Sequence, residues 1–427
     1  MNQLKALKRI EPRILVPLTL GIMFALGDES SNPKGYIMQG RESLIVKIVV
    51  FCVLFCALFR TMDILIHRIY AAKDRSCERH CSGFFEYGYA IKPWLKNAAI
   101  IATCWLPYEF WLFPGVYWSD TSKQLLIHYG AERFTDHHPF TLTYIFGWFA
   151  DFGQRVFHNP IYGLYLLIAI QLIAAPLVFS WMLLYTRKMG IPQWLCHVEL
   201  AFFALFPFFP VMFSSLAKDT ISVLFFIPFC ILFIDGIRTK GTSLVRPGTI
   251  IALTLCGLLT CLTKKAGMYV IIPSMLLMFL IAGVSKKAKT IAFAIGTAIA
   301  VVMIIIIPKT VMPTLGIAPG GKQETIPFAI QQVAHDVKYN NKDITPQERK
   351  LISDFLTIDY KNIPTAYDPQ IADPIKGTSL RNPELFNDFI KLWLKKTAEH
   401  PIGHLEAWMG LVHGWFKIGR ASCRERV

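Results

Sequence analysis

Long apolar runs alternate with short basic loops along most of the chain. Residues 161–185, 266–284 and 290–308 carry no Asp, Glu, Lys, Arg or His. Each run is close to the roughly 20 residues with which a helix crosses a bilayer, and core helices of soluble proteins seldom stay uncharged for so long. The pattern therefore predicts an all-α integral membrane protein, a polytopic bundle of about nine or ten transmembrane helices.

The same pattern sets the bounds of the predicted spans. They are residues 14–27, 44–60, 95–116, 161–185, 194–215, 219–236, 249–263, 267–284 and 290–308. The apolar stretch 140–152 is too short to cross, so we expect a juxtamembrane helix that lies flat on the membrane surface. A polar insert follows the last span, with helices expected near 325–338, 345–355 and 383–399. The middle helix starts with a capping box, Thr345 with Glu348.

Basic residues predict on which side of the membrane each loop lies. Lys and Arg are enriched in cytoplasmic loops, and a basic stretch precedes the first span. With the N-terminus in the cytoplasm, residues 117–160 form an outer loop, and the insert also lies outside. The exceptions to the rule are Lys218 and the Lys264–Lys265 pair, which fall at the outer ends of helices.

These assignments divide the chain into six segments. They are an N-terminal transmembrane pair (1–60), a cytoplasmic basic loop (61–93), a transmembrane core (94–309), a small, mainly helical extracytoplasmic insert (310–401), the start of a further membrane-associated segment (402–417) and a C-terminal stretch (418–427). The last stretch, IGRASCRERV, breaks the composition abruptly and matches the translation of a common sequencing adapter. We therefore exclude it and expect the natural protein to continue past Lys417.

Composition supports the membrane as solvent, because 54% of the 427 residues are hydrophobic and only 17% are charged. The formal charge of +15 is carried by short loops between apolar runs, which excludes nucleic acid as a partner. Seven of the ten cysteines fall in apolar segments and are predicted to be small hydrophobic residues rather than disulfides. Cys77, His80 and Cys81 could hold a metal, but no second pair accompanies them, which favours free thiols in a reducing loop.

The outer lysines have two interpretations. Cations at a membrane boundary need counter-ions, and long lysine side chains can instead reach lipid head groups. The functional alternative is a clamp for a phosphate or diphosphate, formed by Lys218, Lys264 and Lys265, because Lys binds phosphate as a point charge. Asp219 belongs to the same group by its place next to Lys218. Gly267 would let the backbone approach a bulky anion closely.

The outer loop after the third span carries the strongest candidate for chemistry. Asp120 follows the expected helix end at Pro114 and lies near Trp118, at the membrane edge. It could simply cap the helix that starts there. A carboxylate at an apolar boundary is also desolvated, which suits it to accept a proton from a hydroxyl group. Lys123, which follows on the same helix, is counted with the binding residues.

Asp136, His137 and His138 precede Pro139 and the surface helix. A lone histidine is usually a polar interfacial residue, but two histidines beside an aspartate on the Asp120 side are candidates for ligand contact. The chain contains neither a D-x-D nor an H-E-x-x-H motif. We therefore expect no tightly bound cofactor and no catalytic divalent cation.

With these elements in view, the chain resembles the GT-C superfamily of polytopic glycosyltransferases, in particular the bacterial branch of lipid A aminoarabinose transferases and protein mannosyltransferase-like enzymes. SDT at 119–121 looks like the acidic outer loop, residues 124–129 like the juxtamembrane helix, and HHPF at 137–140 like the element that opens a second surface helix. SSLAKDT and LTKKAGMY are similar to elements of an uncharacterised multi-pass bacterial family. The likeness spans residues 94–417, with Ala217 where that family has Trp.

The resemblance implies an inverting transfer of a sugar from a polyprenyl-phosphate donor to a cell-envelope acceptor, at the outer face of the bacterial cytoplasmic membrane. By position, Asp120 would be the base, and the basic residues above would hold the lipid phosphate among membrane lipids. A flippase or transporter for lipid-linked sugars is an alternative that needs ionisable groups at mid-membrane. The candidates for these groups are Lys47, Glu109 and Glu199. A non-catalytic envelope assembly protein is a third hypothesis.

Overall fold

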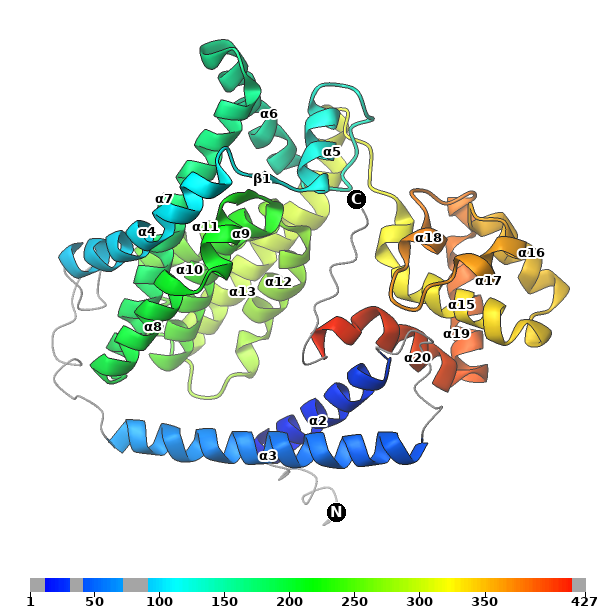
Figure 1. The fold of residues 1–427 in the computed structure, drawn as a ribbon, viewed down its shortest axis with the longest axis horizontal. Helices are drawn as coiled ribbons and strands as arrows, with labels where there is room; N and C mark the ends of the chain where they lie inside the picture. Colours follow the sequence, from blue (N-terminus) through cyan, green and yellow to red (C-terminus); the bar gives the residue numbers. More distant parts are fainter. Residues whose placement is uncertain (1–11, 31–40, 72–90, 417–427) are drawn as a thin grey trace. The chain divides into compact units, whose positions relative to one another are not determined.

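Figure 1 shows the computed structural model of the chain, which describes residues 12–30, 41–71 and 91–416. Several predicted features lie outside the described residues. They are most of the first outer loop, much of the basic loop with Cys77, His80 and Cys81, and the C-terminal stretch 418–427. The seven cysteines in the described part of the chain are free thiols, as predicted.

The chain divides into two compact units, a bundle unit of residues 69–320 and an insert unit of residues 1–68 with 321–427. Helices dominate the described residues of both. Among these residues, four helices are long and apolar enough to cross a membrane: Ser43–Arg68, Pro160–Lys188, Lys218–Arg238 and Lys286–Thr314. Shorter apolar helices are Gln193–Leu205, Pro247–Thr263 and Lys265–Leu280. These lengths and compositions support an all-α protein that associates with a membrane.

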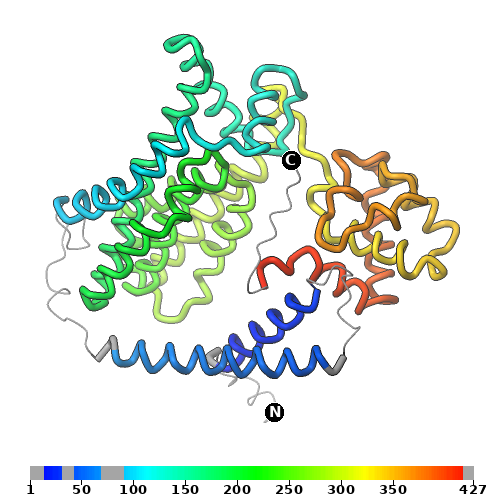
Figure 2. The backbone as a smooth tube through the Cα atoms, in the orientation of Figure 1, coloured from blue at the N-terminus to red at the C-terminus, as the bar shows by residue number. Residues whose placement is uncertain are grey.

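The bundle unit consists of helices packed along one another (Figures 1 and 2). They are α4 (Ile91–Leu112), α5 (Ser119–His128), α6 (Phe140–Phe157), α7 (Pro160–Lys188), α8 (Gln193–Leu205), α9 (Phe208–Phe213), α10 (Lys218–Arg238), α11 (Pro247–Thr263), η2 (Lys265–Gly267), α12 (Met268–Leu276), η3 (Leu277–Leu280), α13 (Lys286–Ala300), the π-helical η4 (Val301–Val311) and α14 (Met312–Thr314). α10 to α13 pack around Phe229, Leu253 and Met275, whereas α4, α7, α8 and α9 pack around Trp105 and Phe179. α5 and α6 pack with α7 and the start of α10 in a third cluster, around Leu142 and Phe146.

Prolines account for the main differences from the predicted spans. The helix predicted at 194–215 is broken, because Phe206 is extended and Pro207 cannot continue an α-helix. α4 ends at Leu112, just before Pro114, instead of reaching residue 116. Apolar composition predicted where the helices lie, but not where they stop.

α6 and α7 approach each other closely because two glycines meet between them. α6 runs on to Phe157, past the predicted end at 152, and α7 starts at Pro160. A Cβ on Gly163 would overlap the backbone carbonyl of Phe149, and a Cβ on Gly153 would overlap the backbone nitrogen of Gly163. Backbone atoms cannot move aside as a flexible side chain can, so both positions require glycine. The orientation of α6 relative to a membrane stays a prediction.

Gly163→Ala should force α6 away from α7 and destabilise the protein by about 1–3 kcal/mol, the usual effect of overpacking. The measurement is thermal unfolding of the detergent-purified protein, followed by tryptophan fluorescence. Gly414→Ala is the control, because a Cβ there meets no atom within 4 Å. The unfolding midpoint should fall for Gly163→Ala alone, and equal midpoints for both variants would contradict the close packing.

The insert unit combines an N-terminal helix pair with a cluster of short helices. Its elements are α2 (Pro12–Ser30), α3 (Arg41–Ala71), η5 (Lys322–Thr325), α15 (Pro327–Tyr339), η6 (Asn341–Asp343), α16 (Pro346–Phe355), η7 (Tyr360–Asn362), α17 (Ile363–Ala366), α18 (Asp373–Lys376), η8 (Pro383–Leu385), α19 (Phe386–Glu399), α20 (Pro401–Val412) and η9 (His413–Trp415). Lys47 of α3 pairs with Asp28 and Glu29 of α2 at 2.9 and 2.6 Å. The predicted capping box of Thr345 and Glu348 at the start of α16 is confirmed.

A buried polar network fastens α20 to α15. The fully buried Asp336 carboxylate accepts a hydrogen bond from His404 Nε2 at 2.8 Å. Gln332 of α15 also donates to the backbone carbonyl of His404, at 2.7 Å. Burial opposes the ionisation of Asp336, but its contacts with His335 and His404 outweigh burial and lower its pKa to about 2. The carboxylate is therefore charged at neutral pH and depends on its histidine partners.

His404→Ala should leave the Asp336 charge buried and short of a partner, which destabilises a protein by about 3–5 kcal/mol. Hydrogen exchange of the full-length protein should then show lower protection of the α15 amides. The control is Lys391→Ala, which removes only an exposed ion pair with Asp388 and should leave α15 protected. Wild-type protection of α15 in the His404→Ala variant would show that the network does not fasten α20.

Candidate functional site

A two-residue parallel sheet brings Asp120 and Lys218 together. β1 (Val116–Tyr117) pairs with β2 (Ser215–Leu216), first residue with first and second with second. α5 begins two residues after β1 ends, and α10 begins two residues after β2 ends. The first turns of these two helices therefore lie side by side, although the strands are almost 100 positions apart in the sequence.

Asp120 and Lys218 form an ion pair in these first turns. Lys218 Nζ donates a hydrogen bond to Asp120 Oδ2 at 2.6 Å. Thr121 holds the turn in place by donating its hydroxyl to the carbonyl of Leu216 at 2.5 Å. The interpretation of Asp120 as a helix cap is wrong, because Trp118 occupies the cap position and no side chain caps α5. The carboxylate is instead engaged by Lys218 and remains open to solvent.

His138 is buried beside this ion pair. It is 4% exposed, and its Nδ1 lies 3.9 Å from Asp120 Oδ2, too far for a hydrogen bond. Gln124 of α5 anchors the following residues by donating to Thr143 Oγ1 at 3.1 Å and to the carbonyl of Pro139 at 3.4 Å. Neither ring nitrogen of His138 finds a hydrogen-bond partner among the described residues. A buried polar group without a partner is uncommon and indicates a ligand or a rearrangement.

Burial and neighbouring charges set the protonation states of this pair. Desolvation lowers the pKa of His138 to about 4, although the Asp120 charge opposes this effect. The positive charges of Lys218 and Lys123 lower it further. Desolvation also acts to raise the pKa of Asp120, but the hydrogen bond and charge of Lys218 outweigh it, so the pKa lies below its ordinary value. A neutral imidazole therefore faces an ionised carboxylate at neutral pH.

Lys264 and Lys265 each have an aspartate of their own. Lys264, at the end of α11, pairs with Asp219 in the first turn of α10. Lys265 Nζ lies 2.6 Å from Asp136 Oδ2 and also donates to the backbone carbonyl of Asp136. Desolvation raises the pKa of Asp136 in spite of Lys265. With the pair described above, three lysine–aspartate pairs form one connected group at this end of the bundle unit.

The remaining predicted site residues lie at the margin. Lys123 is exposed and one helical turn beyond Asp120, so the two side chains share a face of α5. His137 is exposed, with its ring centroid 4.5 Å from that of His138. Gly267 is buried against α11 and allows close helix packing, so the prediction that it admits an anion is wrong.

Two residues that sequence analysis left out of the binding set belong to the site. Asp136 pairs with Lys265, and its place next to His137 was the available signal. Gln124 is 1% exposed and anchors the segment that follows His138. Its spacing of four from Asp120 places both on one helical face, but nothing in the sequence indicates that Gln124 is buried.

The opposite end of the bundle unit carries a separate charge cluster. Asp235, near the end of α10, pairs with Lys188 of α7 at 3.3 Å and with Arg238 at 3.2 Å. α10 has 21 residues and is therefore about 30 Å long, close to the hydrocarbon thickness of a bilayer. Lys218 and the Asp235 cluster thus lie near opposite ends of a helix that is long enough to span a bilayer. Which end faces the cytoplasm stays a prediction.

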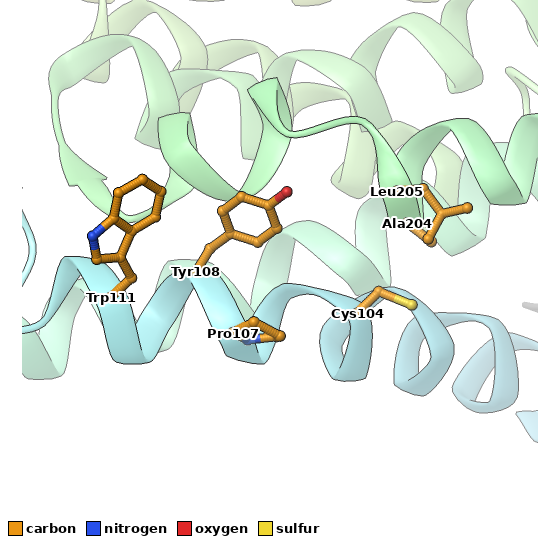
Figure 3. A pocket seen from close by; sticks show the side chains of 6 residues that line it. All are labelled: Cys104, Pro107, Tyr108, Trp111, Ala204 and Leu205. Atoms are coloured by element: carbon orange, nitrogen blue, oxygen red, sulfur yellow. The ribbon is translucent and has the colours of Figure 1, made fainter.

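An apolar hollow of about 340 Å³ lies between α4 and α8 (Figure 3). It is lined by Cys104, Pro107, Tyr108, Trp111, Ala204 and Leu205. Figure 3 shows the rings of Tyr108 and Trp111 projecting to the same side of α4. None of the predicted site residues lines this hollow, so it is distinct from the charged group.

The charged group combines ammonium groups with carboxylates at positions that solvent can reach. Each of its lysines is neutralised by an aspartate, but a phosphoryl group competes for ammonium groups and forms short, charge-assisted hydrogen bonds. A carboxylate released in this way can accept a proton. In the part of the chain that the structure describes, no three His, Cys, Asp or Glu side chains are arranged to hold a metal ion.

Residues 126–422 match the model of a family of unknown function, DUF6020. The chain belongs to this family. The DUF6020 match contains His137, His138, Lys218, Asp219, Lys264 and Lys265, whereas Asp120 and Lys123 precede it. No curated protein and no solved structure matches the chain.

The buried, neutral His138 gives this DUF6020 protein a pH-dependent stability. Its pKa is 6.5 ordinarily and about 4 in the fold, so the unfolded chain binds more protons between these values. The contribution of His138 to stability should therefore fall by about 2 kcal/mol as the pH falls from 7 to 5, whereas His335, whose pKa is raised by its carboxylate neighbours, contributes in the opposite direction. Asp120 does not contribute in this window, because its stabilisation is lost only below its ordinary pKa of 3.8.

The measurement is the thermal unfolding midpoint of the detergent-purified protein at pH 7 and pH 5. His138→Gln should lose this part of the pH dependence. His137→Gln, a change at the exposed neighbour, should keep the wild-type dependence. The same pH dependence in the wild type and in His138→Gln would show that His138 is not held neutral by burial.

Proposed function

We propose that this DUF6020 protein is a membrane glycosyltransferase of the GT-C type. It would transfer a sugar from a polyprenyl-phosphate donor to a cell-envelope acceptor. The observation that carries the proposal is the Asp120–Lys218 ion pair, with His138 beside it, at the start of a helix long enough to span a membrane. A lipid-linked donor presents its phosphate at such a boundary, where ammonium groups can meet it.

In the proposed reaction, Asp120 is the base. The acceptor hydroxyl gives its proton to the Asp120 carboxylate while its oxygen forms a bond to the anomeric carbon. The bond between that carbon and the phosphate oxygen breaks, and its electron pair leaves with the lipid phosphate. Because the acceptor attacks opposite the leaving group, the anomeric configuration inverts. No tightly bound cofactor or divalent cation is part of this proposal.

The lysines stabilise the charge that develops on the leaving phosphate. Lys218, Lys264 and Lys265 supply three ammonium groups from two neighbouring segments, and Asp219 positions Lys264. The exposed side chains of Lys123 and His137 lie at the margin, where they can contact the rest of the donor. This distribution of cations suits a phosphate ester better than an uncharged sugar.

The proposed location is the bacterial cytoplasmic membrane, which the chain crosses several times with its N-terminus in the cytoplasm. Two observations support it. Several helices have the length and composition of spans. Basic residues such as Lys188 and Arg238 lie at the end of α10 opposite Lys218, where a cytoplasmic surface would retain them. The site would then face the outer side of the membrane.

A flippase or transporter is less well supported by the geometry. Ser214 donates to Glu109 at 2.6 Å, and Thr186 donates to Glu199 at 3.3 Å. Lys47 lies in the insert unit, in an ion pair with two carboxylates. Each candidate for mid-membrane chemistry thus already has a local partner, whereas transport requires groups that bind and release cargo.

Asp120→Asn should lower sugar transfer by about 100-fold or more, because an amide cannot accept the proton of the acceptor hydroxyl. The assay incubates membranes that contain the full-length protein with labelled polyprenyl-phosphate sugars and measures label in the cell-envelope acceptor. Asp151→Asn is the matched control, because it changes a carboxylate that pairs with His128 at 3.1 Å and lies on α6. The control should transfer at the wild-type rate.

Immunoblots should show equal amounts of wild type and both variants in the membrane. Wild-type transfer by Asp120→Asn would remove Asp120 from the mechanism. If the wild type transfers none of the labelled sugars, the transporter and the non-catalytic assembly protein become the better hypotheses.

A further inference from the structure

His138 has a property that the proposed reaction does not use. It is 4% exposed, and neither of its ring nitrogens has a hydrogen-bond partner among the described residues. Its Nδ1 faces Asp120 Oδ2 at 3.9 Å, about 1 Å beyond hydrogen-bond length. An unsatisfied imidazole in a buried position is unfavourable, and a partner gained at a later stage would offset this.

Lys218 is the hydrogen-bond partner of Asp120 at the carboxylate oxygen that His138 faces. Its Nζ lies 2.6 Å from Oδ2, the same carboxylate oxygen that faces His138. The side chains of Lys218 and Asp120 are 28% and 43% exposed, so a ligand can reach the ion pair from solvent. A ligand cannot reach the buried His138 in the same way. Lys218, like the more exposed Lys264 and Lys265, is therefore open to an incoming anion, and it is the lysine of the group that is bound to Asp120.

We propose that Lys218 changes partner when a phosphoryl group binds. Its ammonium group passes from Asp120 to the phosphoryl oxygens, and His138 Nδ1 then donates a hydrogen bond to the released carboxylate. His138 is thus a positioning residue, which holds the base without touching the substrate. This inference rests on the proposed function, because it states what the phosphate of the donor does to the base.

The exchange couples the basicity of Asp120 to donor binding. With Lys218 as partner, the pKa of Asp120 lies below its ordinary value. A neutral imidazole lowers the pKa of a carboxylate less than an ammonium group does, so the released Asp120 is the stronger proton acceptor. The histidine tautomer with its proton on Nδ1 is the one that can donate to Asp120. The acceptor hydroxyl would then lose its proton only when a donor is present.

The groups around His138 determine the direction of the expected titration shift. Besides desolvation, the charges that act on it are those of Asp120, His137, Lys218 and Lys123. Asp120 raises the pKa of His138, and the other three lower it. Transfer of Lys218 to a phosphoryl group removes one lowering charge and brings the Asp120 carboxylate onto the ring. The pKa of His138 should therefore rise when the anion binds.

The test follows the titration of His138 in the full-length protein in lipid nanodiscs. Histidines labelled with ¹³C at Cε1 give up to one NMR signal for each of the 11 histidines, and the signal lost in His138→Gln identifies His138. Inorganic pyrophosphate is the probe for the phosphoryl group. Its addition should raise the midpoint of His138 by about one pH unit or more, a tenfold change in proton affinity.

Two lysine variants separate the partner exchange from a general charge effect. Lys218→Ala frees Asp120 and should raise the midpoint of His138 without pyrophosphate. Lys264→Ala is the matched control, because it frees Asp219 instead and should leave the midpoint at the wild-type value. Adding Asp120→Asn to Lys218→Ala should cancel the rise.

A His138 midpoint that pyrophosphate leaves unmoved in the wild type would overturn the inference, and in this measurement His138→Gln serves only to assign the signal. An unmoved midpoint in Lys218→Ala would overturn it as well. The outcome is independent of sugar transfer. A protein that transfers no sugar but shows the rise would keep the partner exchange and lose the proposed function, whereas transfer with an unmoved midpoint would do the reverse.

Discussion

The parallel pairing of β1 with β2 is the contact on which the candidate site depends. α4 ends at Leu112, and Gly115 turns the chain into β1 with a φ of 107°, at a point where a Cβ would overlap Ile168. Gln171 of α7 fixes the other strand by donating to the carbonyl of Ser215 at 2.7 Å. The two strands then start two helices side by side. Without this pairing, the Asp120 carboxylate and the Lys218 ammonium group would not be held side by side.

Much of the helical architecture follows from patterns that are local in the sequence. Uncharged runs predict α7 and the long helical segment from α13 to α14, and a capping box predicts the start of α16. What local patterns cannot predict is contact over long sequence separations. The hydrogen bond between Asp336 and His404 and the contact between Gly153 and Gly163 both depend on how helices pack. Prolines such as Pro207 break helices that their apolar composition would continue.

The candidate site was predictable as a set of residues but not as a geometry. The distribution of basic loops predicted that Asp120, Lys218 and the lysines after α11 lie on one side of a membrane. The structure brings these residues to one end of the bundle unit. Sequence could not show which aspartate each lysine meets, because Asp136 and Lys265 are 129 positions apart. Nor could it show that His138 is buried without a hydrogen-bond partner among the described residues.

The exposure of the ion pairs separates exchangeable contacts from structural ones. Asp235 is 4% exposed and Lys188 is 13% exposed, so neither can leave the other without exposing a charge to an apolar interior. The pairs of Asp120 with Lys218 and of Asp219 with Lys264 are between 28% and 48% exposed. Such pairs contribute little to stability, because water screens them and can replace either partner. The charges at this end neutralise one another, and their low contribution to stability suits the proposed exchange, in which a phosphoryl group would displace a carboxylate at a small free-energy cost. In that proposal, binding an anion and releasing a base are two consequences of the same exchange.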